Sequence, residues 1–315
     1  TRTTMNILEC ILIDATTNVI KFTSNDMELG IETIVEGEII EKGKVAIEAK
    51  LFSEIVRRSP DNEVTISTDA NYTSLITCEK SKINIAGKSG EDFSFLPIID
   101  KDKMITISQF NLKEIINQTI FSTAPNDNNK MMTGELFEVS DNTLKVVGLD
   151  GHRIAIRSIQ LEGRADDVKA VVPGKTLQEI SKLMSTDAEN MVNIYFTNNH
   201  ILFEFDNTIV VSRLIEGEYF KINQMLSSDY ETKVVINKKE FIGSIDRANL
   251  LITESEKKPI IINITDGSLE VTVNSSKGKF NEDINIKKEG KDLMIGFNPK
   301  FLMDALRVID DENVD

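Results

Sequence analysis

The feature of this sequence that most restricts its fold is an internal repeat with a constant offset of 125 residues. Each of three segments opens with a lysine, has an apolar residue two positions later, and closes with a carboxylate followed by a second apolar residue. The three segments are residues 50–55, 175–180 and 300–305. A repeat this long corresponds to whole domains, not to the short units of a solenoid.

Apolar residues in and after these segments recur at a spacing of three and four residues. This spacing predicts amphipathic helices at residues 50–60, 174–184 and 299–309. Pro173 and Pro299 lie at the start of two of them, where a missing N–H does no harm. A second type of helix is predicted at residues 109–121 and again at 238–251.

Between the helices the sequence alternates or runs β-branched, which predicts strands. Residues 144–150 match residues 269–275 at the same offset, and Asp141-Asn142 and Asp266-Gly267 supply turn residues before them. We therefore expect an α+β fold of three repeated domains, at residues 1–103, 104–232 and 233–315. The first copy lacks a counterpart of the 109–121 helix and the third stops soon after its second helix, so we expect both end domains to be truncated.

Bulk composition restricts the class of protein. No apolar run approaches the ~18 residues of a membrane-spanning helix, and no signal peptide opens the chain. The two cysteines, Cys10 and Cys78, cannot form a disulfide framework and are expected to be buried thiols of a cytoplasmic protein. Two isolated histidines make a zinc cluster improbable, and we expect no metal and no cofactor.

Net charge argues at first against nucleic acid, because it is −15. However, the five predicted helices carry +5, so the rest of the chain carries −20. If the helices share one face, that face can meet phosphate while the acidic remainder does not. The alternative is that Lys and Arg are simply good helix formers, and the repetition at Lys50, Lys175 and Lys300 favours function.

Catalytic motifs are missing. Gly174-Lys175-Thr176 and Gly87-Lys88-Ser89 resemble a phosphate loop, but Lys169 and Lys82 stand where its first glycine is needed. No G-x-S-x-G elbow occurs. Scattered carboxylates leave a metal-dependent nuclease or hydrolase as one alternative, and a repeat-domain scaffold protein as another.

The segment Asp150-Gly151-His152-Arg153 lies between two β-like runs and predicts a turn in which Gly151 adopts positive φ. Two interpretations stay open on spacing alone. His152 and Arg153 are solvated hairpin residues, or they form with Ile154 the rim of a groove that receives a partner's peptide.

Five motifs carry a resemblance to a known family. They are the runs at residues 149–155, 171–175, 212–217, 295–298 and 93–97, which read LDGHRIA, VVPGK, SRLIEG, IGFN and FSFLP. In this order and spacing they resemble bacterial DNA sliding clamps, the beta subunit of DNA polymerase III. The resemblance covers essentially the whole chain.

This resemblance implies a non-enzymatic processivity factor built from three clamp-type domains, with helices packed on antiparallel sheets. Two subunits would close head-to-tail into a homodimer ring around double-stranded DNA, without sequence preference and without a membrane. The implied partners are the replicative polymerase catalytic subunit, the clamp loader and other proteins with a clamp-binding motif.

Site residues follow from the resemblance position by position. The partner-peptide groove is expected at Met132, Gly151, His152, Arg153, Ile154, Phe220 and Met225. The DNA-facing positions are expected at Arg2 and Asn126, and the repeated helices add Lys50, Arg57, Lys175, Lys182 and Lys300. The ring-closing contacts are expected at Phe93, Leu96, Leu250 and Leu251. Leu149 and Phe220 depart from the Thr and Pro common in the family, and Lys130 and Met131 replace its usual tip aromatics.

Overall fold

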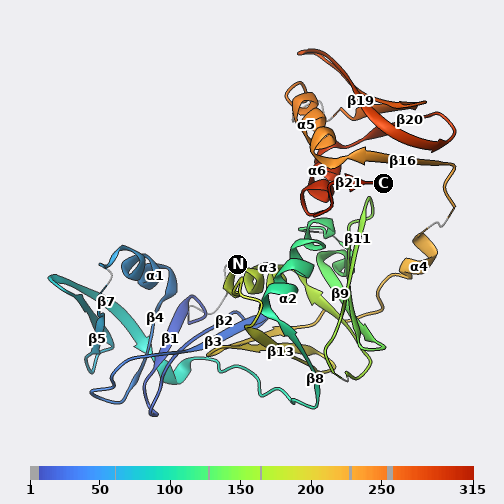
Figure 1. Cartoon of the computed structure of the whole chain (residues 1–315). Helices are drawn as coiled ribbons and strands as arrows, with labels where there is room; N and C mark the ends of the chain where they lie inside the picture. Colours follow the sequence, from blue (N-terminus) through green and yellow to red (C-terminus); the bar gives the residue numbers. More distant parts are fainter. Residues whose placement is uncertain (1–6, 61, 127, 164, 227–228, 254–257) are drawn as a thin grey trace.

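A computed structural model describes residues 7–60, 62–126, 128–163, 165–226, 229–253 and 258–315. The chain forms three α+β domains that follow one another along an arc (Figure 1). In each domain the longer helices lie on the inner side of the arc and the sheets on the outer side, whereas the four-residue helix Ile222–Met225 lies on the outer side. The fold class expected from the sequence is confirmed.

The first domain packs one helix, α1, on antiparallel strands. Its elements are β1 Cys10–Asp14, β2 Ile20–Asn25, β3 Leu29–Val35, β4 Lys44–Glu48, α1 Ala49–Arg58, β5 Thr65–Thr68, β6 Thr73–Cys78, β7 Ser81–Ser89 and a 3-10 turn, η1 Gly90–Asp92. Phe52 and Ile55, on the buried face of α1, pack on Ile47 and Ile76 of the sheet.

The second domain has two long helices, α2 and α3, between two sheets. Its elements are β8 Lys103–Ser108, α2 Gln109–Asn117, η2 Ile120–Ser122, η3 Lys130–Thr133, β9 Gly134–Ser140, β10 Thr143–Leu149, β11 Ile154–Gln160, β12 Val168–Pro173, α3 Gly174–Leu183, β13 Met191–Phe196, β14 His200–Phe205, β15 Thr208–Arg213 and α4 Ile222–Met225. The Ser108 side chain accepts a hydrogen bond from the backbone N–H of Asn111 and so caps α2.

The third domain repeats part of the second domain, because its helices α5 and α6 correspond to α2 and α3. Its elements are β16 Thr232–Asn237, α5 Lys238–Asn249, β17 Ile260–Thr265, β18 Ser268–Ser275, β19 Gly278–Gly290, β20 Leu293–Phe297, α6 Pro299–Arg307 and β21 Asn313–Val314. Pro299 is the first residue of α6, and Asn298 caps the helix through the N–H of Lys300. The helices α1, α3 and α6 begin at residues 49, 174 and 299, so they keep the 125-residue offset.

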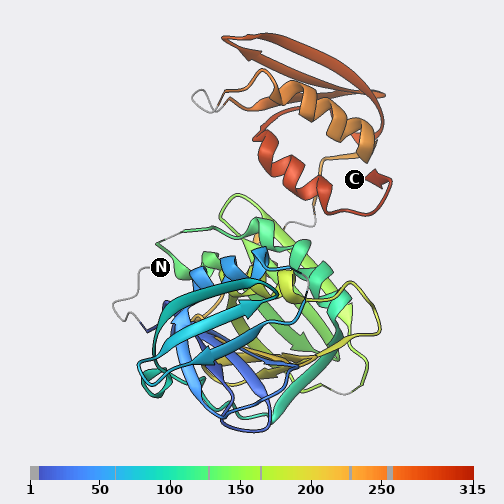
Figure 2. The same ribbon diagram turned by 90° about the vertical axis from the view of Figure 1, so that its left-hand side faces the viewer.

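Two kinds of joint connect the domains. β3 of the first domain pairs with β15 of the second from Leu29–Ser212 to Thr33–Thr208, so one eleven-stranded antiparallel sheet runs through both domains. The third domain has its own six-stranded sheet, β20-β17-β18-β19-β16-β21. Viewed from the side, this domain lies above the other two (Figure 2), and its sheet does not continue into theirs.

Two predicted boundaries fall one residue inside a strand. Boundaries after residues 103 and 232 cut a strand after its first residue, because β8 begins at Lys103 and β16 at Thr232. Both residues already pair inside the following domain, Lys103 with Phe196 and Thr232 with Gly290. Both strands would stay whole if each boundary were drawn just before the strand's first residue.

Candidate functional site

The turn after β10 is built around the carboxylate of Asp150. Its Oδ1 accepts hydrogen bonds from the backbone N–H groups of His152 and Arg153 at 3.1 and 3.2 Å. Gly151 has φ of +83°, a conformation that glycine adopts without strain. The turn therefore holds the side chains of His152 and Arg153 in fixed directions at the end of β10, as the sequence predicted for the backbone.

Arg153 points toward the third domain. Its Nε donates to Asp150 Oδ2 at 2.9 Å and its Nη1 to Asp304 Oδ2 of α6 at 2.8 Å. The guanidinium also lies over the rings of Phe301, 4.4 Å from the centroid, and Phe121, at 5.3 Å. Its side chain is 17% exposed. Such a satisfied guanidinium cannot be described as a solvated hairpin residue.

The apolar part of the expected groove gathers next to this turn. Leu136, Val147, Leu149, Val171, Tyr219 and Ile222 form a buried cluster, against which Met131, Met132, Ile154, Ile215 and Phe220 pack while remaining partly exposed. The Tyr219 hydroxyl donates to the Val147 carbonyl at 3.1 Å, and burial raises the pKa of Tyr219. The structure thus brings Met132, Ile154 and Phe220 together.

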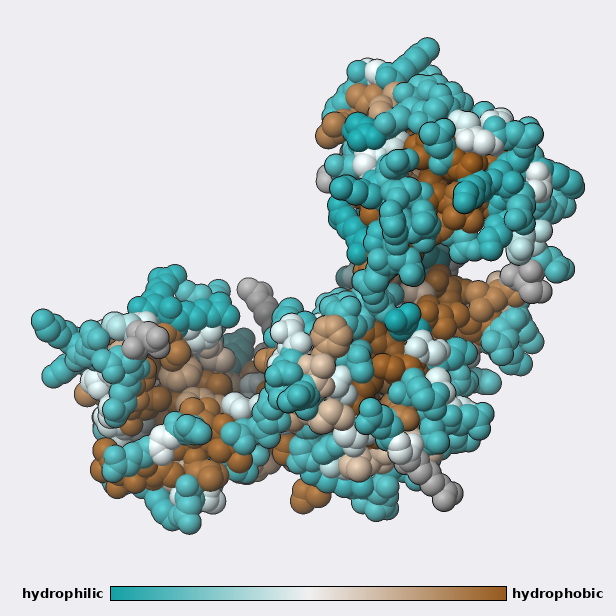
Figure 3. All heavy atoms as spheres, viewed as in Figure 1, coloured by the Kyte–Doolittle hydropathy of each residue, from teal (hydrophilic) through white to brown (hydrophobic). Residues whose placement is uncertain are grey.

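Met225 lies at the end of the short helix α4 and is 52% exposed, next to Leu226 at 50%. Figure 3 shows an apolar surface where α4 leads from the second domain toward the third. Ile222 anchors α4 in the buried cluster. Exposed methionine and leucine beside a partly covered apolar cluster are suited to contact an apolar side chain of a partner.

Sequence reasoning missed the contribution of α6. Phe301 stacks on His152 with ring centroids 5.7 Å apart, and Asp304 bonds Arg153. Both residues lie in the repeated segment at 300–305, where only the lysine and the apolar spacing were interpreted. An aromatic residue at position 301, where the other two copies have Leu51 and Thr176, was the available signal.

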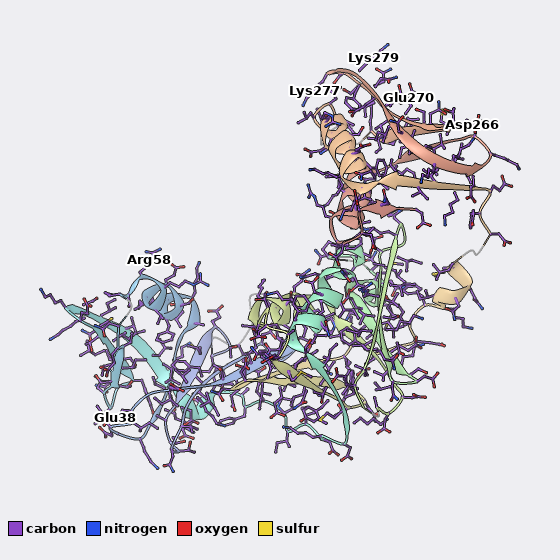
Figure 4. The ribbon with its side chains drawn as sticks, in the orientation of Figure 1. Glu38, Arg58, Asp266, Glu270, Lys277 and Lys279 are labelled. Carbon is purple, nitrogen blue, oxygen red and sulfur yellow. The ribbon has the colours of Figure 1, made fainter. Side chains whose placement is uncertain are left out.

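The expected DNA-facing residues lie on the helices of the inner side. Lys50, Lys175 and Lys300 are exposed and are each the second residue of α1, α3 and α6. Arg57 is also exposed, at the other end of α1. In Figure 4, Arg58 of α1 lies on this side, whereas Glu38 lies on the opposite side of the first domain. Asn126 is exposed in the loop after η2, and Arg2 lies outside the described residues.

Two of these lysines already have an anionic partner. Lys175 Nζ lies 3.1 Å from Asp26 Oδ2, and Lys182 Nζ lies 2.9 Å from Glu179 Oε1. The Asp26 carboxyl is partly buried, but hydrogen bonds from backbone N–H groups and from Lys175 lower its pKa. These two lysines therefore present less net charge to a phosphate than Lys50 and Lys300, for which the described part of the chain records no ion pair.

The ring-closing assignment in the first domain needs correction. Phe93 is only 3% exposed because it packs on Cys10, Leu12 and Ala46. Leu96 packs on a cluster of the second domain that contains Tyr195, Leu202 and Val211. Both side chains therefore stabilise contacts within the chain and do not form an exposed closing surface.

The third-domain residues are placed differently. Leu250, at the C-terminal end of α5, is 73% exposed. Leu251 is partly buried against the core of its domain. Only Leu250 of the four expected interface residues therefore offers a large exposed apolar side chain.

Comparison with known proteins gives a consistent result over the whole chain. Residues 1–97, 106–221 and 223–315 match the N-terminal, central and C-terminal domains of the DNA polymerase III beta subunit. The chain belongs to this family. Membership identifies a sliding clamp, an accessory subunit without catalysis, as the sequence analysis expected.

Individual relatives agree. The chain is 36% identical to the beta sliding clamp of Staphylococcus epidermidis, over 100% of this chain and 86% of that protein. A crystal structure of a putative DNA polymerase III beta subunit from Eubacterium rectale is 65% identical, with a TM-score of 0.95 over 99% of this chain and 85% of the other. The DNA polymerase sliding clamp of Bacillus subtilis is 32% identical, with a TM-score of 0.94 over 99% and 85%.

Two further observations concern metal binding and membrane-spanning helices. Within the described residues, no group of three or more His, Cys, Asp or Glu side chains is arranged to hold a metal ion. In the same part of the chain, no helix has the length and apolar character needed to cross a bilayer.

Proposed function

We propose that the chain acts as a DNA polymerase processivity factor, a ring of two copies that encircles duplex DNA and tethers the replicative polymerase, the clamp loader and other partners. The observation that carries this proposal is the placement of helices with equivalent basic residues along the inner side of one arc. Two such arcs joined head-to-tail enclose a hole lined by these helices.

Contacts from this lining go to phosphates. Lysine and arginine side chains on helices can neutralise backbone phosphates without reading base edges, so the ring binds every sequence alike. The acidic remainder of the chain keeps DNA off the outer surface. Weak, uniform contact of this kind allows sliding, while the closed ring prevents escape.

Ring closure requires a surface in the first domain other than Phe93 and Leu96. β7 pairs with β6 only over residues 81–86 and with β4 over 87–89, so the first part of the strand has one edge without a strand partner among the described residues. β19 has the same property over residues 278–285. We place the closing contact between these two edges, β7 of one copy and β19 of the other.

Side chains at these two edges are complementary. In the proposed contact Lys82 of β7 meets an edge of β19 that carries Asp283, whose neighbour Glu282 is already paired with Arg247. A hollow of about 310 Å³ next to β7 is lined by Leu51, Ile55, Pro60 and Ile83 among others. α5 contacts β19, and we propose that the exposed Leu250 at the C-terminal end of α5 inserts into this hollow of a second copy.

The groove beside the Asp150 turn receives the partners. An extended peptide with apolar side chains would contact Met132, Ile154, Phe220 and Met225, whose exposed surfaces adapt to different residues. This gives polymerase and clamp loader one shared docking site. We place the protein in the cytoplasm, where the replicating DNA of a bacterium lies.

A topological assay tests the proposal. The clamp is loaded by its loader on nicked circular DNA, and the amount that co-elutes with DNA is measured before and after the circle is cut. We expect retention on the circle and loss from the linear form, because an encircling ring runs off free ends. Equal retention on both forms contradicts encirclement.

A further inference from the structure

The two interdomain joints differ in the interactions that hold them. The joint between the first and second domains contains backbone hydrogen bonds of the β3–β15 pair, and Leu96 packs across it. In addition, Leu29 and Ile31 of β3 pack on the core of the second domain. Bending this joint breaks strand pairing and exposes apolar surface, so it is stiff.

The joint between the second and third domains has neither of these features in the described part of the chain. The described strands of the third domain pair only with one another, and its core cluster contains residues 234–314 alone. The recorded contacts across this joint are made by side chains. They are Arg153 with Asp304 and Phe301, His152 with Phe301, and a 3.4 Å hydrogen bond from Gln118 to Asp310.

We propose that Arg153 restrains a hinge between the second and third domains by contacting Asp304 and Phe301 of α6. An interdomain contact that is small and polar permits relative motion unless specific interactions oppose it. Arg153 opposes this motion because its guanidinium donates hydrogen bonds to both domains. Nε donates to Asp150 in the second domain, and Nη1 donates to Asp304 in the third.

The chemistry of this contact requires arginine. The guanidinium is planar, so it can lie between the rings of Phe121 and Phe301 while its edges bind two carboxylates. The side chains of Arg153, Asp150 and Asp304 are 17, 12 and 24% exposed, so salt screens the contact less than it screens surface pairs. A lysine has one charged atom and cannot make both contacts with the same geometry.

The position of this fastening connects it to the groove and to the inner surface. Arg153 belongs to the turn that borders the apolar cluster, and Phe301 follows Lys300 directly in α6. A change in the angle between these domains therefore moves one wall of the groove and one helix of the inner lining together. Arg153 acts here as a positioning residue.

Distance measurements between spin labels test this inference without DNA or a partner protein. One label pair, at Ser158→Cys and Asn274→Cys, spans the hinge, and a second pair, at Thr65→Cys and Ser158→Cys, spans the sheet joint. All three positions are exposed, and the native Cys10 and Cys78 are buried. Labelled chains are diluted with unlabelled chains so that only distances within one chain contribute.

We expect Asp304→Asn and Phe301→Ala to broaden and shift the distance distribution across the hinge and to leave the sheet joint unchanged. Phe301→Tyr keeps the ring and should retain the narrow distribution. The matched control is Lys175→Met, which removes the Lys175–Asp26 ion pair across the sheet joint and should change neither distribution. Unchanged distances across the hinge in both Asp304→Asn and Phe301→Ala, with circular dichroism showing a folded protein, would overturn the inference.

Because the measurement needs neither DNA nor loader, its failure is distinct from a failure of the proposed function. A ring that slides on DNA with a rigid second joint would contradict only the hinge.

Discussion

Glu135 of β9 is a buried carboxyl whose ionisation the fold opposes. Its side chain is fully buried, and neither carboxyl oxygen has a hydrogen-bond partner. The nearby Thr119 hydroxyl donates instead to the Ile115 carbonyl at 2.7 Å. A Cβ at Gly148 would lie 3.3 Å from Glu135 Oε1 and 2.7 Å from the Thr119 carbonyl oxygen, so only glycine leaves room there.

Burial raises the pKa of Glu135 from 4.5 to about 8. Between pH 4.5 and 8 the unfolded chain is ionised at this residue and the folded chain is not. The unfolded state therefore binds fewer protons, and the free energy of unfolding falls as pH rises through this window, by about 1.4 kcal/mol per pH unit. The total loss is about 5 kcal/mol above pH 8.

Glu135→Gln removes this titration. We expect the difference in unfolding free energy, variant minus wild type, to rise by up to about 5 kcal/mol between pH 4.5 and 8 and to be constant above that pH. Equilibrium urea unfolding followed by circular dichroism at several pH values measures it. Taking the difference cancels every other titrating group.

A second variant on the same strand provides the control. Glu138 binds Lys169 and Lys145 at 3.2 and 3.5 Å, and these lysines lower its pKa. Its stabilising contribution is present above the unfolded pKa, so Glu138→Gln should lose a constant amount of stability from pH 5 upward. A Glu135→Gln difference that is equally independent of pH would refute the reasoning.

Three further predictions concern the surfaces of the ring. Leu250→Asp should convert dimers to monomers in sedimentation velocity, because it removes the apolar side chain of the proposed closing contact, while Leu183→Asp, also at an exposed leucine, should not. Lys300→Ala should reduce the salt dependence of binding to a short duplex by about one unit of slope, and Lys175→Ala by less, because Lys175 is paired with Asp26. Ile154→Ala should weaken binding of a polymerase-derived peptide in calorimetry by about 1–2 kcal/mol, with Met191→Ala on β13 as the unaffected control. Monomers from both leucine variants would contradict the closing contact at Leu250. Equal salt slopes for Lys300→Ala and Lys175→Ala would contradict the role of the Lys175–Asp26 ion pair. Equal peptide affinities for Ile154→Ala and Met191→Ala would contradict the groove.

The structure also changes how the groove should be tested. A direct test of the groove rim is to replace His152 and Arg153 together and to measure peptide affinity. Since Arg153 bonds Asp304 and His152 stacks on Phe301, that double variant would disturb the domain joint as well as the groove. Ile154 has no recorded contact with α6 and separates the two effects.

Periodicity was sufficient to predict the helices, several strands and the threefold repeat, because these depend on local spacing. α1, α3, α5 and α6 lie within two residues of their predicted limits, while α2 stops at Asn117 and η2 covers much of the remainder of its predicted segment. The short helix α4 was not predicted, since its four residues contain too little periodicity.

Contacts between distant strands were beyond such reasoning. The pairing of β3 with β15 joins two strand edges whose sequences contain no signal for one another. That pairing draws Leu96 onto the second domain. Phe93 and Leu96 were therefore assigned to an exposed surface that the chain itself covers. Glu135 was missed for a related reason, because a glutamate in a strand is ordinarily exposed.

The position of the three repeated lysines within their helices favours function over helix stability as the reason for these three residues. Lys50, Lys175 and Lys300 lie in the first turns of α1, α3 and α6, and these turns contain no acidic residue. The helix dipole is positive there, so a cation is disfavoured by about 0.3–1 kcal/mol and a carboxylate would be favoured. A choice made for helix stability would therefore place lysine at the other end. Three equivalent lysines in an unfavourable position therefore support our proposal that these residues contact an anion, and the phosphates along a duplex supply anions to all of them.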